Sequence, residues 1–429
     1  MNRKRFLIIF SLNLGYLLLR HLTVSNNFLV TTPFSSPIIP SFFRLIPEFF
    51  SFFTLVYCLY KKNKNIANYW WLFLFILLFS LVTSSIISTS DYGKTNFIRM
   101  LSSIRSWFIW LSPFIIGMTL FEREDLAIFY KSSIVICIIQ VPLIILQARL
   151  VSEADFVTGL MGEWGSGILG IFQTLGSIYL LEFILSKRIP LIIGLMLVCL
   201  IMPPVILAKA MIVFLIMPIS FLLLVLISKS SKKRVVNLLM ICILLLVPIL
   251  SMINIYTGEY SGGIEKSATL IWSRISVALE NSATSYGGPT RLYYLGTVMQ
   301  YISKNPVTLM FGYGLGYASS SRLSINNVNE NILQYSTGVS SFIVTILLEN
   351  GLMGVITIIL FLVGIYSSLR KKMKYSRNLP GFDFDAVGMT TLIIISALVF
   401  YNRSFASPTL AWVLMPQLGI YVQRVIKKC

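Results

Sequence analysis

Charged side chains are scarce in this sequence. Asp, Glu, Lys and Arg together make up 12% of the 429 residues, whereas soluble domains carry about a quarter. Hydrophobic residues reach 56%, the mean hydropathy is +0.82, and apolar runs of about 20 residues recur along the chain. Each run is long enough to cross a hydrocarbon core of roughly 30 Å. This composition excludes a set of soluble domains, and we expect residues 1–429 to form a single transmembrane helical bundle.

The residues that build metal centres and disulfides are also few. The chain has one histidine, His21, and five cysteines, of which four lie in apolar runs and Cys429 is the last residue. The sequence contains no Cys-x-x-Cys pair, His-Glu-x-x-His motif, Walker-type loop or Gly-x-Ser-x-Gly motif. We therefore expect no cofactor and no metal, and we interpret the cysteines as small buried hydrophobic residues.

Acidic residues are outnumbered by basic ones, 16 to 35, which gives a net charge of +19. A nucleic-acid-binding role is not indicated, because the basic residues form no face with interleaved aromatics. They gather instead in short blocks between apolar runs, as the cytoplasmic loops of membrane proteins do. The blocks are NRKR (2–5), KKNK (61–64), SKR (186–188), KSSKKR (229–234), RKKMKYSR (370–377) and RVIKKC (424–429).

The apolar runs predict an all-α, polytopic bundle of about twelve transmembrane helices. The spans are expected near 6–22, 41–60, 69–88, 104–121, 128–148, 166–185, 189–207, 210–228, 235–256, 342–369, 386–401 and 409–424. With the first basic block in the cytoplasm, alternation places every dense block and both termini inside. An outer turn is expected near Pro203–Lys209, because two prolines interrupt the apolar pattern there.

One external loop, residues 257–338 between the ninth and tenth spans, is much longer than the others. Apolar residues recur in it at helical spacing from Ile264 to Leu279. Pro289–Thr290 then opens a second expected helix, which ends before Asn305–Pro306. We expect a helical cap over the outer mouth of the bundle, with GYGLG (312–316) as a turn that closes it.

A carboxylate follows the cap in SSFIVTILLENGLMG, residues 340–354. Counting twenty residues back from Arg370 at 1.5 Å per residue places Glu349 near the outer interface. Residues 340–348 would then form an approach helix under the cap, and Gly351 and Gly354 would let another helix come close. Glu349 is either an interfacial structural residue or a catalytic one, and the sequence leaves both interpretations open.

Several basic residues remain on the predicted outer side, where Lys and Arg are normally depleted. They are Arg99, Arg105, Lys209, Arg274, Arg291, Arg322 and Arg403. One guanidinium group can bind two phosphate oxygens at once, in a bidentate contact, so such a cluster suits a diphosphate. Each arginine alone has a structural alternative as a snorkelling or paired side chain.

Three segments resemble motifs of the superfamily of O-antigen ligases and Wzy-type polymerases of bacterial surface polysaccharides. GEWGSGILGIFQTLGSIYL (162–180) resembles its glycine-containing segment that enters a span, and TRLYYLGTVMQYISKNPVTLMFGYGLG (290–316) resembles its loop pattern. SSFIVTILLENGLMGV (340–355) resembles the ligase signature, with Ser341, Gly351, Gly354 and Val355 in place. Ser340 departs from it, because the signature has a histidine there. The resemblance also covers the layout of spans and loop.

The resemblance implies a glycosyltransferase on the outer face of the bacterial cytoplasmic membrane. It would polymerise oligosaccharide repeat units carried on undecaprenyl diphosphate, with a flippase and a chain-length regulator as pathway partners. Arg291 and Lys209 would bind the diphosphate, helped by Arg105, Arg274 and Arg322. Glu349 would deprotonate the acceptor hydroxyl or orient a loop arginine, and it is preferred to Glu163 and Glu330 for this role. The alternatives are a ligase that transfers finished glycan and, in another class, a lipid-linked oligosaccharide flippase.

Overall fold

In the residues that it describes, a computed structural model of the chain has helices and one pair of two-residue strands as its regular elements. It describes residues 3–24, 52–53, 56–57, 60, 68–89, 97–150, 157–161, 166–207, 211–227, 283–284, 288–289, 291–318, 341–375, 383–401 and 407–423.

The longer helices are α1 (Arg3–Val24), α3 (Asn68–Thr89), α4 (Phe97–Leu120), α5 (Leu126–Leu150), α6 (Ser166–Leu185), α7 (Leu191–Leu207), α8 (Met211–Ile227), α14 (Phe342–Tyr375), α15 (Phe384–Tyr401) and α16 (Pro408–Val422). The shorter elements are η2 (Arg123–Asp125), η4 (Gly159–Met161), β1 (Ala283–Thr284), β2 (Gly288–Pro289), α11 (Arg291–Ile302) and α12 (Pro306–Phe311). The two strands pair antiparallel, with Ala283 opposite Pro289.

Within the described residues, five helices are long and apolar enough to cross a membrane. They are Tyr69–Thr89, Arg99–Leu120, Arg123–Leu150, Gly167–Leu185 and Phe342–Met373. Four shorter apolar helices accompany them: Leu191–Val205, Ile216–Ile227, Phe384–Val399 and Pro408–Val422. The expected span near 235–256 lies outside the described residues, and so does nearly all of that near 41–60. The chain is thus an α-helical membrane protein, and the full number of crossings stays a prediction.

The outer surface of the bundle is apolar. Phe75 of α3, Ile192 of α7 and Leu226 of α8 expose 68%, 73% and 70% of their surface. Side chains of this kind would be unfavourable in water at about 25 cal/mol per Å², but they are compatible with lipid tails. These exposed apolar side chains therefore mark the faces of the bundle that would contact lipid.

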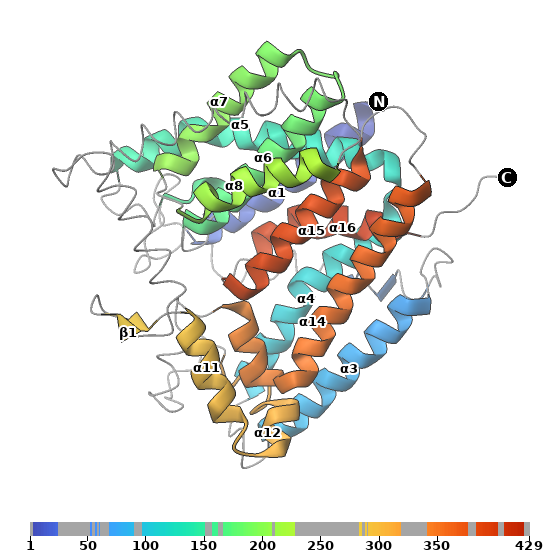
Figure 1. Cartoon of the computed structure of the whole chain (residues 1–429), viewed down its shortest axis with the longest axis vertical. Coiled ribbons are helices and arrows are strands. Elements are labelled where there is room, and N and C mark those ends of the chain that lie inside the picture. Colours follow the sequence, from blue (N-terminus) through green and yellow to red (C-terminus); the bar gives the residue numbers. More distant parts are fainter. Residues whose placement is uncertain are drawn as a thin grey trace.

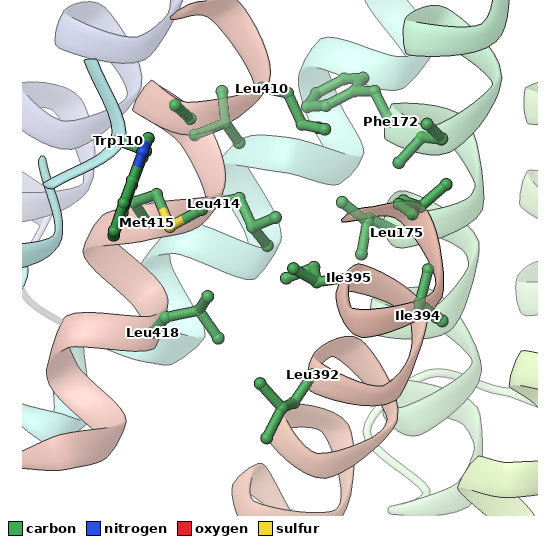
Figure 2. Packing of buried hydrophobic residues seen from close by; sticks show 14 of the residues in the cluster. Trp110, Phe172, Leu175, Leu392, Ile394, Ile395, Leu410, Leu414, Met415 and Leu418 are labelled. Atoms are coloured by element: carbon green, nitrogen blue, oxygen red, sulfur yellow. The ribbon is translucent and has the colours of Figure 1, made fainter. Parts of the chain in front are cut away.

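Inside the bundle, aromatic and aliphatic side chains interdigitate. Trp110 of α4 and Phe361 of α14 lie 4.7 Å apart between ring centroids, and Phe114 lies 4.9 Å from Phe361. Figure 2 shows how side chains of α6, α15 and α16 fill the neighbouring space. Ile395, Leu398, Leu410, Ala411, Leu414 and Met415 line a small apolar hollow there.

Helices α4 and α16 pack with their backbones in direct contact. A Cβ atom on Gly117 would lie 2.0 Å from the Pro416 carbonyl oxygen, and one on Gly419 would lie 2.0 Å from that of Phe114. Neither distance is sterically possible, so only glycine permits this approach. Gln423, just past α16, donates to the carbonyl groups of Gly117, Met118 and Phe121 and fixes the end of the pair.

The expectation of a turn near Pro203–Lys209 is wrong in one respect. Helix α7 continues through Pro203 and Pro204 to Leu207, and α8 begins at Met211. A proline removes one backbone hydrogen bond but does not forbid helix, and proline is more frequent in membrane helices than in soluble ones. The two prolines therefore lie within α7, and residues 208–210, between α7 and α8, lie outside the described residues.

The second predicted helix of the long loop is confirmed. Helix α11 begins at Arg291 and ends at Ile302, and α12 follows with the Asn305 side chain accepting from the Val307 amide at 2.9 Å. Both lie at one end of the molecule, beside α3 and the first part of α14 (Figure 1). The first predicted helix, 264–279, lies outside the described residues.

Candidate functional site

The site begins with a break in α14. Gly351 has φ 59° and ψ −152°, so its backbone leaves the helical conformation and separates residues 342–350 from the rest of the helix. Only glycine adopts this conformation readily. The break frees the Leu348 carbonyl, which accepts from the Tyr313 amide at 2.7 Å. The sequence predicted an approach helix over residues 340–348, and the structure has a helical segment over 342–350 before the break.

The segment Gly312–Gly316 fills the space between the ends of three helices. Gly314 has φ 96°, and a Cβ there would lie 2.4 Å from the Ser88 amide nitrogen of α3. Gly316 has φ 87°, and its Cβ would lie 2.6 Å from the Arg99 carbonyl carbon of α4. Gly312 meets the α14 backbone in the same way. The predicted turn therefore exists, but it is inserted between α3, α4 and α14. We call residues 312–318 the glycine loop.

Glu349 ties the glycine loop to two helices. Its side chain is 3% exposed, Oε1 accepts from the Ala318 amide at 3.1 Å, and Oε2 accepts from the Ser103 hydroxyl of α4. A carboxylate that accepts bonds on both oxygens is well solvated by the protein, and such charge-assisted bonds are stronger than neutral ones. The geometry thus supports Glu349 as a residue that positions the loop.

A second polar contact lies one residue further along. The Asn350 amide, 0% exposed, donates to the Ser84 hydroxyl of α3 at 3.0 Å, and Ser84 donates to the Phe311 carbonyl at 3.3 Å. The Leu315 amide donates to the Ser84 carbonyl at 3.3 Å. A buried polar group is unfavourable unless it is hydrogen-bonded, so this chain of contacts helps to hold α3, α12 and the loop at the break.

Two of the predicted outer cations lie on α4. Arg99 is 6% exposed and precedes Ser103 by four residues, so the two share the helix face that meets the glycine loop. Arg105 follows Ser103 by two residues, which is about 200° around the helix. The structure therefore associates Arg99 with the Glu349 region and places Arg105, which is partly buried, on another face.

Three tyrosines stack beside the loop. The ring centroids of Tyr301 and Tyr313 lie 4.9 Å apart, those of Tyr313 and Tyr317 lie 4.6 Å apart, and the Tyr301 and Tyr317 hydroxyls lie 3.3 Å apart. Burial, together with the neighbouring Tyr301, raises the pKa of Tyr313 to about 12. Burial also raises the pKa of Tyr317, with help from the hydrogen bond to Tyr301. Tyr313 and Tyr317 therefore stay neutral hydrogen-bonding groups near pH 7.

The remaining predicted site residues divide into two groups. Arg291 is the first residue of α11, and Ser341, 1% exposed, directly precedes α14. Gly351 admits the end of α12, since a Cβ there would lie 2.6 Å from the Met310 carbonyl carbon, whereas Gly354 faces Ile346 and Asn350 of its own helix. Both residues belong to the segment before the break at Gly351, so Gly354 lets that helical segment come close rather than a helix from elsewhere in the chain. Lys209, Arg274, Arg322, Arg403, Ser340, Glu163 and Glu330 lie outside the described residues.

Sequence reasoning missed Ser103, Ser84 and Ala318. Each binds a partner far away in the sequence: Ser103 is 246 residues from Glu349, and Ser84 is 266 residues from Asn350. The one available signal was the spacing of glycines in GYGLG, which indicates a backbone in close contact with something. It does not reveal which helices the loop contacts.

No family model, curated protein or solved structure matches the chain. In the part of the chain that the structure describes, no three His, Cys, Asp or Glu side chains gather as a metal site would require. The functional argument therefore depends on the site itself and on the resemblance of the sequence motifs.

Proposed function

We propose that the protein is a membrane glycosyltransferase that polymerises undecaprenyl-diphosphate-linked oligosaccharide repeat units, a Wzy-type polymerase. The observation that carries the proposal is the buried Glu349, joined to the glycine loop and to α4 at the predicted outer end of the bundle. A charged residue buried in a membrane protein is a functional candidate by default. Arg99 lies on the face of α4 that also carries Ser103. Two of the three segments that resemble motifs of the superfamily, 290–316 and 340–355, meet at this site.

In the reaction, an acceptor sugar hydroxyl attacks the anomeric carbon of the donor glycan. A new glycosidic bond forms, the bond from that carbon to the diphosphate breaks, and the hydroxyl proton is lost. Negative charge grows on the departing undecaprenyl diphosphate, and cations that face it stabilise the transition state. Arg291 and Lys209 are proposed for this role, with Arg105, Arg274 and Arg322 as further diphosphate ligands.

Glu349 contributes mainly by position. Both carboxylate oxygens accept hydrogen bonds, one from the glycine loop and one from α4. Glu349 therefore keeps the glycine loop and the α4 face that carries Arg99 in a fixed position relative to each other. Precise placement of binding groups is worth several kcal/mol of barrier in such transfers. The carboxylate keeps a free lone pair on each oxygen, but it is buried against Ser103 and Ala318, so the role of a base is the less supported one.

The test is complementation of a deletion strain, read as the length of the surface glycan. Arg291→Ala should abolish polymer while the protein level in the membrane stays constant, and Arg291→Lys should recover part of it at best, because a point charge loses paired phosphate contacts. Lys304→Ala is the matched control, since Lys304 is an exposed cation of the same cap. Normal chain length in both Arg291 variants would exclude this residue from the diphosphate site.

The deletion strain itself separates polymerase from ligase. A missing polymerase leaves single repeat units on the usual terminal acceptor, because a separate ligase still acts. A missing ligase leaves long, lipid-linked polymer unattached. Ser340, at the position of the signature histidine, favours the polymerase, since a serine hydroxyl is too weak a base near neutral pH without a neighbouring one.

A further inference from the structure

Helix α14 carries a second buried charge at its other end. Lys372 lies 23 residues beyond Glu349 in the same helix, which is roughly 35 Å at 1.5 Å per residue. Lys372 is 6% exposed, whereas its neighbour Lys371 is exposed. Among the described residues, the Lys372 ammonium has no hydrogen bond and no ion pair. The charge pattern predicts that this end faces the cytoplasm.

A buried phenol without a partner lies next to this turn of α14. Tyr421 of α16 is 2% exposed, and its hydroxyl has no hydrogen-bond partner within the described ranges. A Cβ atom on Gly388 would lie 2.7 Å from Tyr421 Cζ and 2.9 Å from Leu369 Cδ2. Leu369 is one helical turn from Lys372, and Gly388 is one turn from Asp385 of α15. The hydroxyl end of Tyr421 thus lies between those two turns.

The third group is the ion pair of Arg123 and Asp385. Arg123 Nη2 lies 2.7 Å from Asp385 Oδ2, and the side chains are 40% and 1% exposed. Both charges act electrostatically on Lys372, and that of Arg123 acts on Tyr421 as well. Two cations therefore lie around the Asp385 carboxylate, which is paired with only one of them. The partly exposed Arg123 side chain gives this cluster access to the surface.

Carboxylates near this cluster have partners of their own. Glu182 Oε1 accepts from the Asp383 amide at 3.0 Å, and Asp383 Oδ1 accepts from the Ala386 amide at 3.0 Å. Beside Arg123 in the sequence, Glu122 and Asp125 pair with Arg5 at 3.6 and 3.3 Å.

We propose that Arg123, Lys372 and Tyr421 form a binding site for a phosphate group that carries one negative charge. A buried hydroxyl and a largely buried lysine side chain without hydrogen-bond partners are unfavourable, and one anionic acceptor would satisfy both groups. Arg123 retains further N–H donors, and arginine suits phosphate oxygens. The phosphate comes either from the headgroup of an anionic phospholipid in the adjacent leaflet or from free inorganic phosphate.

The experiment uses the full-length protein, purified in detergent and stripped of lipid. Thermal stability is measured with phosphatidylglycerol, with zwitterionic phosphatidylcholine, with inorganic phosphate and with chloride at equal ionic strength. Native mass spectrometry counts the phosphatidylglycerol molecules that stay bound. A shift with phosphatidylglycerol alone assigns the site to lipid, and a shift with inorganic phosphate assigns it to the free ion. No shift with either, or an equal shift with phosphatidylcholine, overturns the proposal.

Variants show whether the shift comes from this cluster. Lys372→Met should weaken phosphate binding by about tenfold or more, because a hydrogen bond to a charged group is lost. Tyr421→Phe should weaken it less, and the exposed control Lys371→Met should bind as the wild type does. Without ligand, Lys372→Met should melt no lower than the wild type. Unchanged binding by Lys372→Met, or a lower melting temperature without ligand, would show that Lys372 is structural.

Discussion

Gly314→Ala should dislodge the glycine loop from the bundle. Gly314 has φ 96°, and an added Cβ would lie 2.4 Å from the amide nitrogen and 2.5 Å from the Cα of Ser88. The left-handed backbone costs an alanine about 1–2 kcal/mol, and overpacking costs about 1–3 kcal/mol more. The contact is with the α3 backbone, which cannot rotate away as a side chain would. We therefore expect a total loss of about 2–5 kcal/mol in the free energy of loop docking.

The assay is the reactivity of a buried reporter. Ala318 is 2% exposed, so Ala318→Cys in a background without the native cysteines should react slowly with a thiol reagent. A loss of 2 kcal/mol corresponds to about a thirtyfold higher population of the open loop, and Gly314→Ala should raise the labelling rate by at least that factor. Surface glycan in the strain that carries Gly314→Ala should become shorter.

Gly15→Ala is the matched control, because no atom lies within 4 Å of a Cβ added to Gly15 in α1. In a helix interior alanine is favoured over glycine by about 0.5–1 kcal/mol, so this variant should label and polymerise as the wild type does. The same labelling rate for Gly314→Ala and Gly15→Ala would refute the close contact between the glycine loop and α3.

The other predictions concern the carboxylate, the tyrosine stack and the topology. Glu349→Ala should lose most polymerising activity and Ser340→Ala should keep much of it, measured as glycan length at equal protein level; equal effects would contradict the role given to Glu349. Stability should fall as pH rises from 10 through 12, because the folded Tyr313 phenol, with its raised pKa, keeps its proton where an unfolded one loses it. Tyr313→Phe should reduce that slope in thermal melts, and an unchanged slope would point to other groups. A cysteine at position 270 should react with an impermeant reagent in intact cells and one at 375 should not; the reverse labelling would invert the topology.

Local signals predicted the elements of the fold well. Pro289–Thr290 and Asn305–Pro306 bracket α11, because proline suits the start of a helix and cannot continue one. Continuous apolar runs predicted helices α3 to α6 and the position of α14. Pro203 and Pro204 misled the reasoning, since the helix continues through both residues in an apolar setting.

The site was harder to predict because it is made of long-range contacts. The sequence marked Glu349 and the glycines of GYGLG as unusual, but nothing local relates Glu349 to Ser103 in α4 or Asn350 to Ser84 in α3. The same holds for Arg123 and Asp385, which are 262 residues apart. A pattern with a period of 3.6 residues assigns a face to each helix, but it does not say which helix that face meets.

The most direct test of the central claim is reconstitution of the reaction. The purified protein in lipid vesicles, given undecaprenyl-diphosphate-linked repeat units and no nucleotide, should produce longer lipid-linked glycans and release one undecaprenyl diphosphate for each bond formed. The yield should persist in the presence of a metal chelator and disappear with Arg291→Ala. Transfer of the repeat units across the vesicle membrane with no new glycosidic bond would contradict the account and identify a transporter.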